Sequence, residues 1–154
     1  MTRSRTVLWS AVAGAGVALA IAGVAVSAGA ANPMDERQAT MKQVGQTMKE
    51  ASAFTGAQTP FDAAKVKALM DGVAGSGKKL HGLYPAGSGA DPKSAADPKI
   101  WENKADFDKR LTEMSALAAT AGKTSSADGF KPAFSALGAT CKSCHDVYRK
   151  KKTT

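Results

Sequence analysis

Five consecutive residues near the end of the chain, Cys141-Lys142-Ser143-Cys144-His145, limit its possible folds more than any other stretch. They contain both cysteines and one of the two histidines of the 154-residue protein. A Cys-x-x-Cys-His sequence is the attachment signal for a c-type haem, whose vinyl groups react with the thiols and whose iron binds the histidine. On a helix, positions i, i+3 and i+4 share one face, so Cys141, Cys144 and His145 can meet one edge and one face of a flat macrocycle. The motif therefore predicts a helix that carries one covalent haem c.

Other interpretations of the two cysteines explain less. A redox Cys-x-x-Cys of the thioredoxin type is expected after a strand in a βαβ unit, whereas the residues around Cys141 have a helical pattern. A zinc site needs further soft ligands, and the remaining histidine, His81, lies far away near the end of another predicted helix. A structural disulfide gives no reason for His145 to follow Cys144 directly. Haem attachment is the interpretation that uses all three residues.

The first thirty residues have the pattern of a secretory signal sequence. Two arginines precede an apolar run of Ala, Val and Gly, and Ala28 and Ala30 fit a small-x-small cleavage site. We expect a cleaved leader over residues 1–30, a mature domain over 31–154 and a periplasmic location, because c-type haem is attached outside the cytoplasm. The alternative is an uncleaved membrane anchor, since about twenty apolar residues can span a bilayer.

The charge balance is basic, with a formal net charge of +8. The terminal run from Arg149 to Lys152 is typical of a solvated helix end, and it would also attract an acidic redox partner protein. We do not expect nucleic-acid binding, because no basic stretch is interleaved with aromatic residues. The sequence contains no carboxylate pair, nucleophile with a base, or phosphate-binding loop, so we expect no catalytic residues and no enzyme.

Four amphipathic segments follow the leader, and none has the alternation of a strand. They span residues 33–55, 59–83 and 98–122 and, from about Gly129, the segment that contains the haem motif. Thr59 is the predicted cap of the second helix, and Pro132 should delay regular helix in the fourth to Gly129–Lys131. Residues 84–98 are rich in Pro, Gly, Ser and Asp, which predicts a long loop. The pattern predicts an all-α antiparallel four-helix bundle with a cofactor between its helices.

Six further short segments share their pattern with one family. They are Arg37-Gln38, Phe61-Asp62-Ala63-Ala64, Tyr84-Pro85-Ala86-Gly87, Ile100-Trp101, Leu137-Gly138-Ala139-Thr140 and Tyr148-Arg149. Together with the haem motif they resemble the class II c-type cytochromes, the family of cytochrome c′ and its low-spin relatives, over about Asp35 to Lys152. The resemblance implies an up-down-up-down bundle with one covalent haem, and a function in electron transfer.

The resemblance also implies how the iron is held. Cys141 and Cys144 would form the thioether bonds, and His145 would be the proximal ligand. Met41 occupies the family position over the distal side of the iron. A methionine that binds there gives a low-spin electron carrier, whereas a side chain that does not bind leaves five-coordinate iron open to nitric oxide or carbon monoxide. We expect Met41 to bind, because a soft sulfur poised near iron needs a structural reason not to; the alternative is a gas-binding protein with Met41 as a lid.

Four other residues are placed around the haem by the same resemblance. Arg37 and Gln38 would lie near the propionates, where a guanidinium makes charge-assisted contacts with a carboxylate. Arg149 would lie over the proximal face, and Trp101 would contact the haem. The alternatives are a solvated surface arginine at position 37 and a core aromatic at position 101. By analogy with family members that pair through their first two helices, a homodimer is expected.

Overall fold

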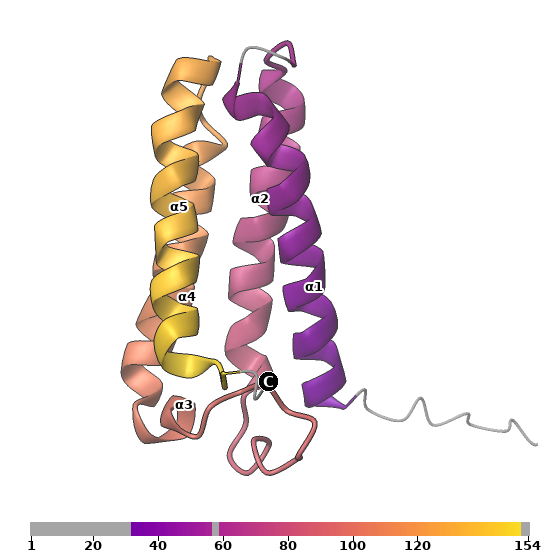
Figure 1. The fold of residues 1–154 in the computed structure, drawn as a ribbon, viewed down its shortest axis with the longest axis vertical. Coiled ribbons are helices and arrows are strands. Elements are labelled where there is room, and N and C mark those ends of the chain that lie inside the picture. Colours follow the sequence, from indigo (N-terminus) through magenta and orange to yellow (C-terminus); the bar gives the residue numbers. More distant parts are fainter. Residues whose placement is uncertain (1–31, 57–58, 152–154) are drawn as a thin grey trace, which may run out of the picture.

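The computed structural model describes residues 32–56 and 59–151, and over these ranges the fold is helical (Figure 1). The long helices are α1 (Pro33–Ser52), α2 (Ala63–Leu80), α4 (Lys104–Ala121) and α5 (Ala127–Tyr148). Shorter elements are α3 (Lys99–Glu102) and the 3₁₀ turns η1 (Ala53–Thr55) and η2 (His81–Leu83). The predicted leader lies outside the described residues. Within those residues, no helix has both the length and the apolar character needed to cross a membrane.

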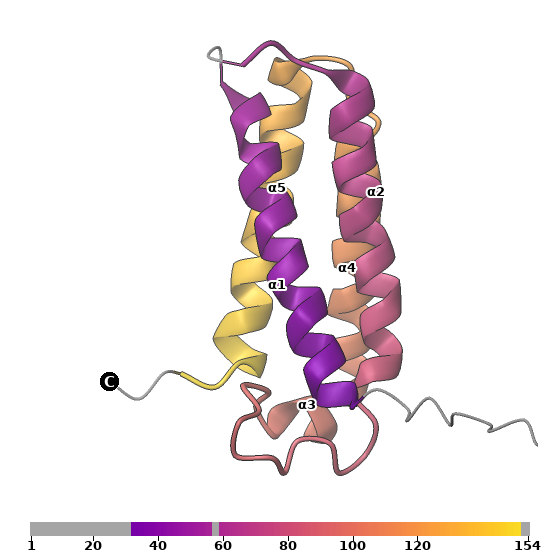
Figure 2. The same cartoon turned by 90° about the vertical axis from the view of Figure 1, so that its right-hand side faces the viewer.

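The four long helices run alternately up and down along one axis (Figures 1 and 2). Helix α2 packs against both α1 and α4, and α4 also packs against α5. Helices α1 and α5, by contrast, contact each other only sparsely. The segment between α2 and α4, which includes α3, covers one end of the bundle (Figure 2). The structure therefore confirms the predicted all-α antiparallel four-helix bundle.

The predicted apolar stripes form the core. On α2, the four side chains of Val66, Met70, Val73 and Leu80 are fully buried. The facing helices contribute further buried side chains, which are Phe107, Leu111 and Ala118 of α4 and Phe130 and Leu137 of α5. Burial of this apolar surface is the main term that stabilises the bundle.

Two helix starts differ from the predicted ones. Asp62, not Thr59, caps α2, because its Oδ1 accepts a hydrogen bond from the Lys65 N–H at 2.9 Å. Helix α5 begins at Ala127, before the predicted range, and Pro132 is its sixth residue. At this position the proline removes one i→i−4 hydrogen bond, to the carbonyl of Asp128 in the first turn, and the helix continues to Tyr148.

The predicted third helix is divided in two. Asn103, with φ −125° and ψ 49°, lies outside the helical region and separates α3 from α4. The first and second helices end in the 3₁₀ turns η1 and η2, so they cover the predicted ranges up to residues 55 and 83.

Candidate haem-binding crevice

A crevice lies between α1 and α5, two helices that contact each other only sparsely. Its inner part is an apolar cavity of about 220 Å³ between α1, α4 and α5. Its outer part, of about 560 Å³, extends toward the loop that follows α2. Four residues line both parts, which are Met41, Gly45, Cys144 and His145. The two cavities therefore adjoin along these residues, and we call them together the crevice.

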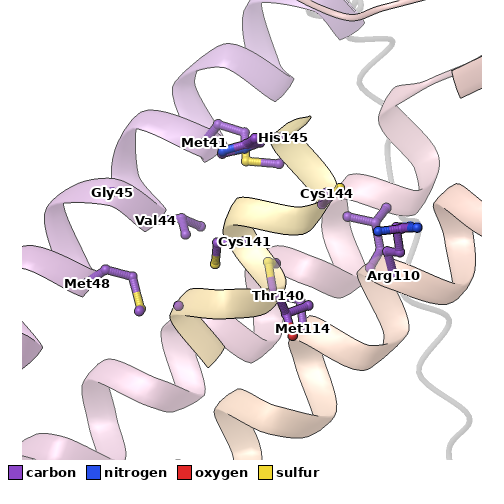
Figure 3. A pocket seen from close by; sticks show the side chains of 12 residues that line it. Met41, Val44, Gly45, Met48, Arg110, Met114, Thr140, Cys141, Cys144 and His145 are labelled. Atoms are coloured by element: carbon purple, nitrogen blue, oxygen red, sulfur yellow. The ribbon is translucent and has the colours of Figure 1, made fainter. Parts of the chain in front are cut away.

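The haem motif lies on the wall that α5 contributes (Figure 3). Cys141 and Cys144 are free thiols of intermediate exposure, and burial raises the pKa of each. Burial, with the nearby Arg149 guanidinium as a smaller cause, lowers the pKa of His145. The surroundings thus favour the neutral imidazole, which is the form that binds a metal.

Methionines form much of the opposite wall. Met41 and Met48 of α1 line the inner cavity, and Met114 of α4 lies beside them. Figure 3 shows Met41 and His145 extending from their two helices into the same region of the crevice. Met34, which begins the predicted stripe of methionines, lines neither cavity and is buried in the protein instead.

The outer cavity has a basic rim. Arg37, Lys42, Lys93 and Arg149 line it, and its lining contains no carboxylate. Gln38 lies at the same rim, with its side-chain Nε2 donating to the Lys93 carbonyl at 3.2 Å. This end of the crevice therefore suits an anionic group.

Arg37 is almost completely buried, with an exposed fraction of 3%. Its guanidinium donates to the Leu83 carbonyl at 3.3 Å, to the carbonyl and hydroxyl of Ser88 at 2.7 and 3.0 Å, and to the Ser94 hydroxyl at 2.8 Å. It also lies over the ring of Tyr84, 5.1 Å from the centroid. All of these partners are neutral. Arg37 is therefore not the solvated surface arginine considered as the alternative.

Trp101 is the predicted haem-contacting residue that lines neither cavity. Its Nε1 donates to the Pro85 carbonyl at 2.9 Å, and its ring centroid is 6.3 Å from that of Tyr84. Tyr84 does line the outer cavity. Trp101 is thus separated from the crevice by one ring, and its direct contact with haem stays a prediction.

Sequence reasoning missed a hydrogen-bonded group next to Cys144. The Tyr148 hydroxyl and the Arg110 Nε both donate to Oδ2 of Asp106, at 2.6 and 2.8 Å. Arg110 also lines the inner cavity with Cys144. The i,i+4 spacing of Asp106 and Arg110 was the available signal, but it is also the spacing of ordinary surface ion pairs.

His81 lies on the other side of the bundle, between α2 and α4. Its Nδ1 is 3.2 Å from Oδ1 of Asp108, and its Nε2 is 3.4 Å from the Thr112 hydroxyl. It lines neither cavity.

The residues of the crevice fit a covalently attached haem. Cys141, Cys144 and His145 lie on one wall with the spacing of the attachment motif. The surroundings of His145 favour the neutral imidazole. The apolar inner part suits a flat macrocycle, and the basic rim suits its two propionates.

Comparisons with known proteins agree with this interpretation. A family model described as cytochrome c′ matches residues 32–149. A cytochrome c′ of Rhodopseudomonas palustris is 37% identical over 119 residues, which cover 77% of this chain and 82% of that protein. A cytochrome c-556 of Agrobacterium fabrum is 37% identical over 125 residues, which cover 80% of this chain and 84% of that protein.

A solved structure shows the same fold. The cytochrome c′ from Rhodopseudomonas palustris superposes with a TM-score of 0.74 at 35% identity and covers 80% of this chain and 100% of its own. With nearly the whole described chain matched in both sequence and structure, the protein belongs to the cytochrome c′ family of class II c-type cytochromes, helical bundles that bind one covalent haem c.

Proposed function

We propose that this chain is an exported carrier of single electrons, with haem attached to Cys141 and Cys144 and with His145 and Met41 as axial ligands. The observation that carries the proposal is the position of Met41. It comes from α1, and it lines both parts of the crevice together with Cys144 and His145 of α5. A thioether and an imidazole from two different helices around one crevice are a pair of axial ligands that makes haem iron six-coordinate.

The bound haem would supply an iron that gains and loses one electron. The chain sets the conditions for that change, because the polarity around a metal centre controls its potential. Val44, Leu111 and Met114 are at most 7% exposed and give the inner cavity apolar walls that exclude water. A thioether ligand favours the reduced state and raises the reduction potential.

The basic rim is the proposed site of the propionates. Arg37 supports this most directly, since all its hydrogen-bond partners are neutral and an uncompensated buried charge costs free energy. A propionate at the rim would supply the missing negative charge. Gln38 would lie near the propionates and Arg149 over the proximal face, and direct contact of Trp101 with the haem stays part of the proposal.

The proposal includes a location and a partner. Export to the periplasm follows from the signal-like residues 1–30 and from the place where c-type haem is attached. The run from Arg149 to Lys152 would attract a redox partner with an acidic surface. The family resemblance supports a homodimer formed through α1 and α2.

The optical spectrum of the reduced holo-protein, recorded before and after addition of carbon monoxide, tests the proposal. We expect sharp low-spin bands that carbon monoxide does not change. The variant Met41→Ala should give a high-spin spectrum that responds to carbon monoxide, and its reduction potential should be lower. Met48→Ala is the matched control, because Met48 lines the inner cavity but is not a proposed ligand. A Met41→Ala spectrum identical to that of the wild type would refute ligation by Met41.

The second candidate is a five-coordinate protein that binds nitric oxide or carbon monoxide, with Met41 as a distal lid. The sequence identity to the cytochrome c′ of Rhodopseudomonas palustris favours this candidate. That identity is 37%, the same as the identity to the cytochrome c-556 of Agrobacterium fabrum. A high-spin wild-type spectrum that sharpens with carbon monoxide would establish this candidate.

A further inference from the structure

Residues 84–97, which we call the strap, run across one end of the bundle (Figure 2). Four of them, Tyr84, Lys93, Ala95 and Ala96, line the outer part of the crevice. The strap is tied first to α1. The Arg37 guanidinium donates to Ser88 and Ser94, and the Gln38 side chain donates to the Lys93 carbonyl. These bonds join α1 to residues some fifty positions later in the chain.

The strap is tied next to the end of α5. The Lys150 N–H donates to the Ala95 carbonyl, and the Asp97 N–H donates to the Tyr148 carbonyl, each at 2.9 Å. Between these bonds, Ala96 and Arg149 form an isolated antiparallel bridge. The strap therefore links the two helices that form the crevice. These helices contact each other only sparsely, and otherwise it is η1, the continuation of α1, that packs against α5.

Ser94 takes part in the hydrogen bonds to α1 and also contacts the segment that pairs with the end of α5. It is 2% exposed, and its hydroxyl oxygen accepts hydrogen bonds from the Arg37 guanidinium at 2.8 Å and from the Ala96 N–H at 3.2 Å. The buried Ser94 oxygen thus connects Arg37 of α1 with Ala96, which forms the bridge to Arg149 at the end of α5. No other hydroxyl in the described strap has both connections.

We propose that Ser94 is a positioning residue for Met41, holding α1 at the separation from α5 that keeps the thioether within reach of the iron. Met41 lies one helical turn after Arg37, on the same face of α1, so the position of the arginine fixes that of the methionine. The inference rests on the proposed ligation by Met41. Bound and unbound states of Met41 are then in equilibrium, and the strap favours the bound one.

The test is the affinity of the reduced holo-protein for carbon monoxide, which can bind only when Met41 is displaced. Ser94→Ala removes a hydrogen bond to a charged group, so we expect an affinity about tenfold higher than that of the wild type. The reduction potential should fall at the same time. Ser94→Thr keeps the hydroxyl and should restore the wild-type affinity.

Ser115→Ala is the matched control. Ser115 is also buried, but its hydroxyl oxygen lies 3.1 Å from both the Ala74 and the Leu111 carbonyl oxygens, which share its single O–H donor where α2 meets α4. We expect this variant to lower the melting temperature without changing the affinity for carbon monoxide. A purely structural role for Ser94 predicts instead that the two alanine variants behave alike in both measurements.

Lys150→Pro removes a hydrogen bond between the strap and the residues that follow α5. This second variant keeps the inference testable if Ser94→Ala fails to fold. Proline removes the N–H that donates to Ala95, and Arg149 already has the extended backbone that a following proline requires. The expected change is again a higher affinity for carbon monoxide. If Met41→Ala raises the affinity while the strap variants that fold leave it unchanged, the positioning role is overturned and ligation by Met41 stands. If Met41→Ala also changes nothing, the proposed ligation itself fails.

Discussion

The Tyr148 hydroxyl, at the end of α5, donates a hydrogen bond to Oδ2 of Asp106, in the first turn of α4, with 2.6 Å between the two oxygens. Arg110 donates to the same carboxylate oxygen, and its guanidinium lies over the Tyr148 ring, 5.6 Å from the centroid. Tyr148 is three residues after His145. The helix that carries the haem motif is therefore fixed to α4 immediately beyond the proposed iron ligand.

Tyr148→Phe should lower the melting temperature at neutral pH by a few degrees, because a hydrogen bond to an ionised carboxylate is stronger than a neutral one. The bonds from Tyr148 and Arg110 lower the pKa of Asp106. A lowered pKa means that this stabilisation is complete above the ordinary carboxyl pKa near 3.8 and is lost as the pH falls through the folded-state value. Thermal melts of both proteins at neutral and strongly acidic pH should therefore show a difference that shrinks in acid.

Tyr84→Phe is the control for that experiment, since no hydrogen bond from the Tyr84 hydroxyl is present among the described residues. This variant should lower the melting temperature by less, and by the same amount at neutral and at strongly acidic pH. Equal, pH-independent losses in the two variants would contradict a specific contribution from the bond to Asp106.

Both tyrosines of the protein should ionise far above the usual range. Burial raises the pKa of Tyr84 to about 12, although Arg37 opposes the shift. Burial and the bond to Asp106 raise the pKa of Tyr148 to about 12. Their stabilising contribution is then complete below the ordinary pKa of 10.0 and is lost as the pH rises toward 12. Phenolate absorbance should appear near pH 12 in the folded protein and near pH 10 in denaturant; a tyrosine that ionises near pH 10 in the folded protein would contradict this.

The bundle and the haem-bearing face of α5 could be predicted because both depend on local periodicity. Cys141, Cys144 and His145 share a face as a consequence of helical spacing alone. The ties of Arg37 to Ser88 and Ser94, in contrast, join residues 51 and 57 positions apart. No local pattern indicates which loop residues will receive a buried guanidinium, so the strap was predicted only as a loop.

The start of α2 shows a second limit of local reasoning. Thr59 and Asp62 are both good cap residues, and the sequence does not decide between them. In the structure, the Phe61 ring packs against Phe54 and Phe130, with centroids 6.4 and 6.0 Å away. This packing is consistent with a helix that begins only after Phe61, which makes Asp62 the cap.

His81→Gln should leave the haem spectrum and the reduction potential unchanged, because His81 contacts Asp108 and Thr112 on the α2–α4 side and lines neither cavity. The matched variant His145→Gln should lose the low-spin spectrum, since it removes the proposed proximal ligand. Optical spectra of the two reduced proteins make the comparison. A changed spectrum in His81→Gln would show that the protein uses its second histidine at the haem.

Two glycines of α2 should respond in opposite ways to the same substitution. A Cβ at Gly77 would clash with the Ser115 hydroxyl and lie 3.1 Å from the Leu111 carbonyl oxygen. The hydroxyl is held by two backbone carbonyls and the helix backbone cannot move freely, so Gly77→Ala should destabilise the fold by about 1–3 kcal/mol. A Cβ at Gly75 has no atom within 4 Å, and Gly75→Ala should stabilise the helix by about 0.5–1 kcal/mol. Chemical denaturation of the two holo-proteins measures both effects, and equal free energies of unfolding would show that α2 and α4 do not pack as closely as the structure indicates.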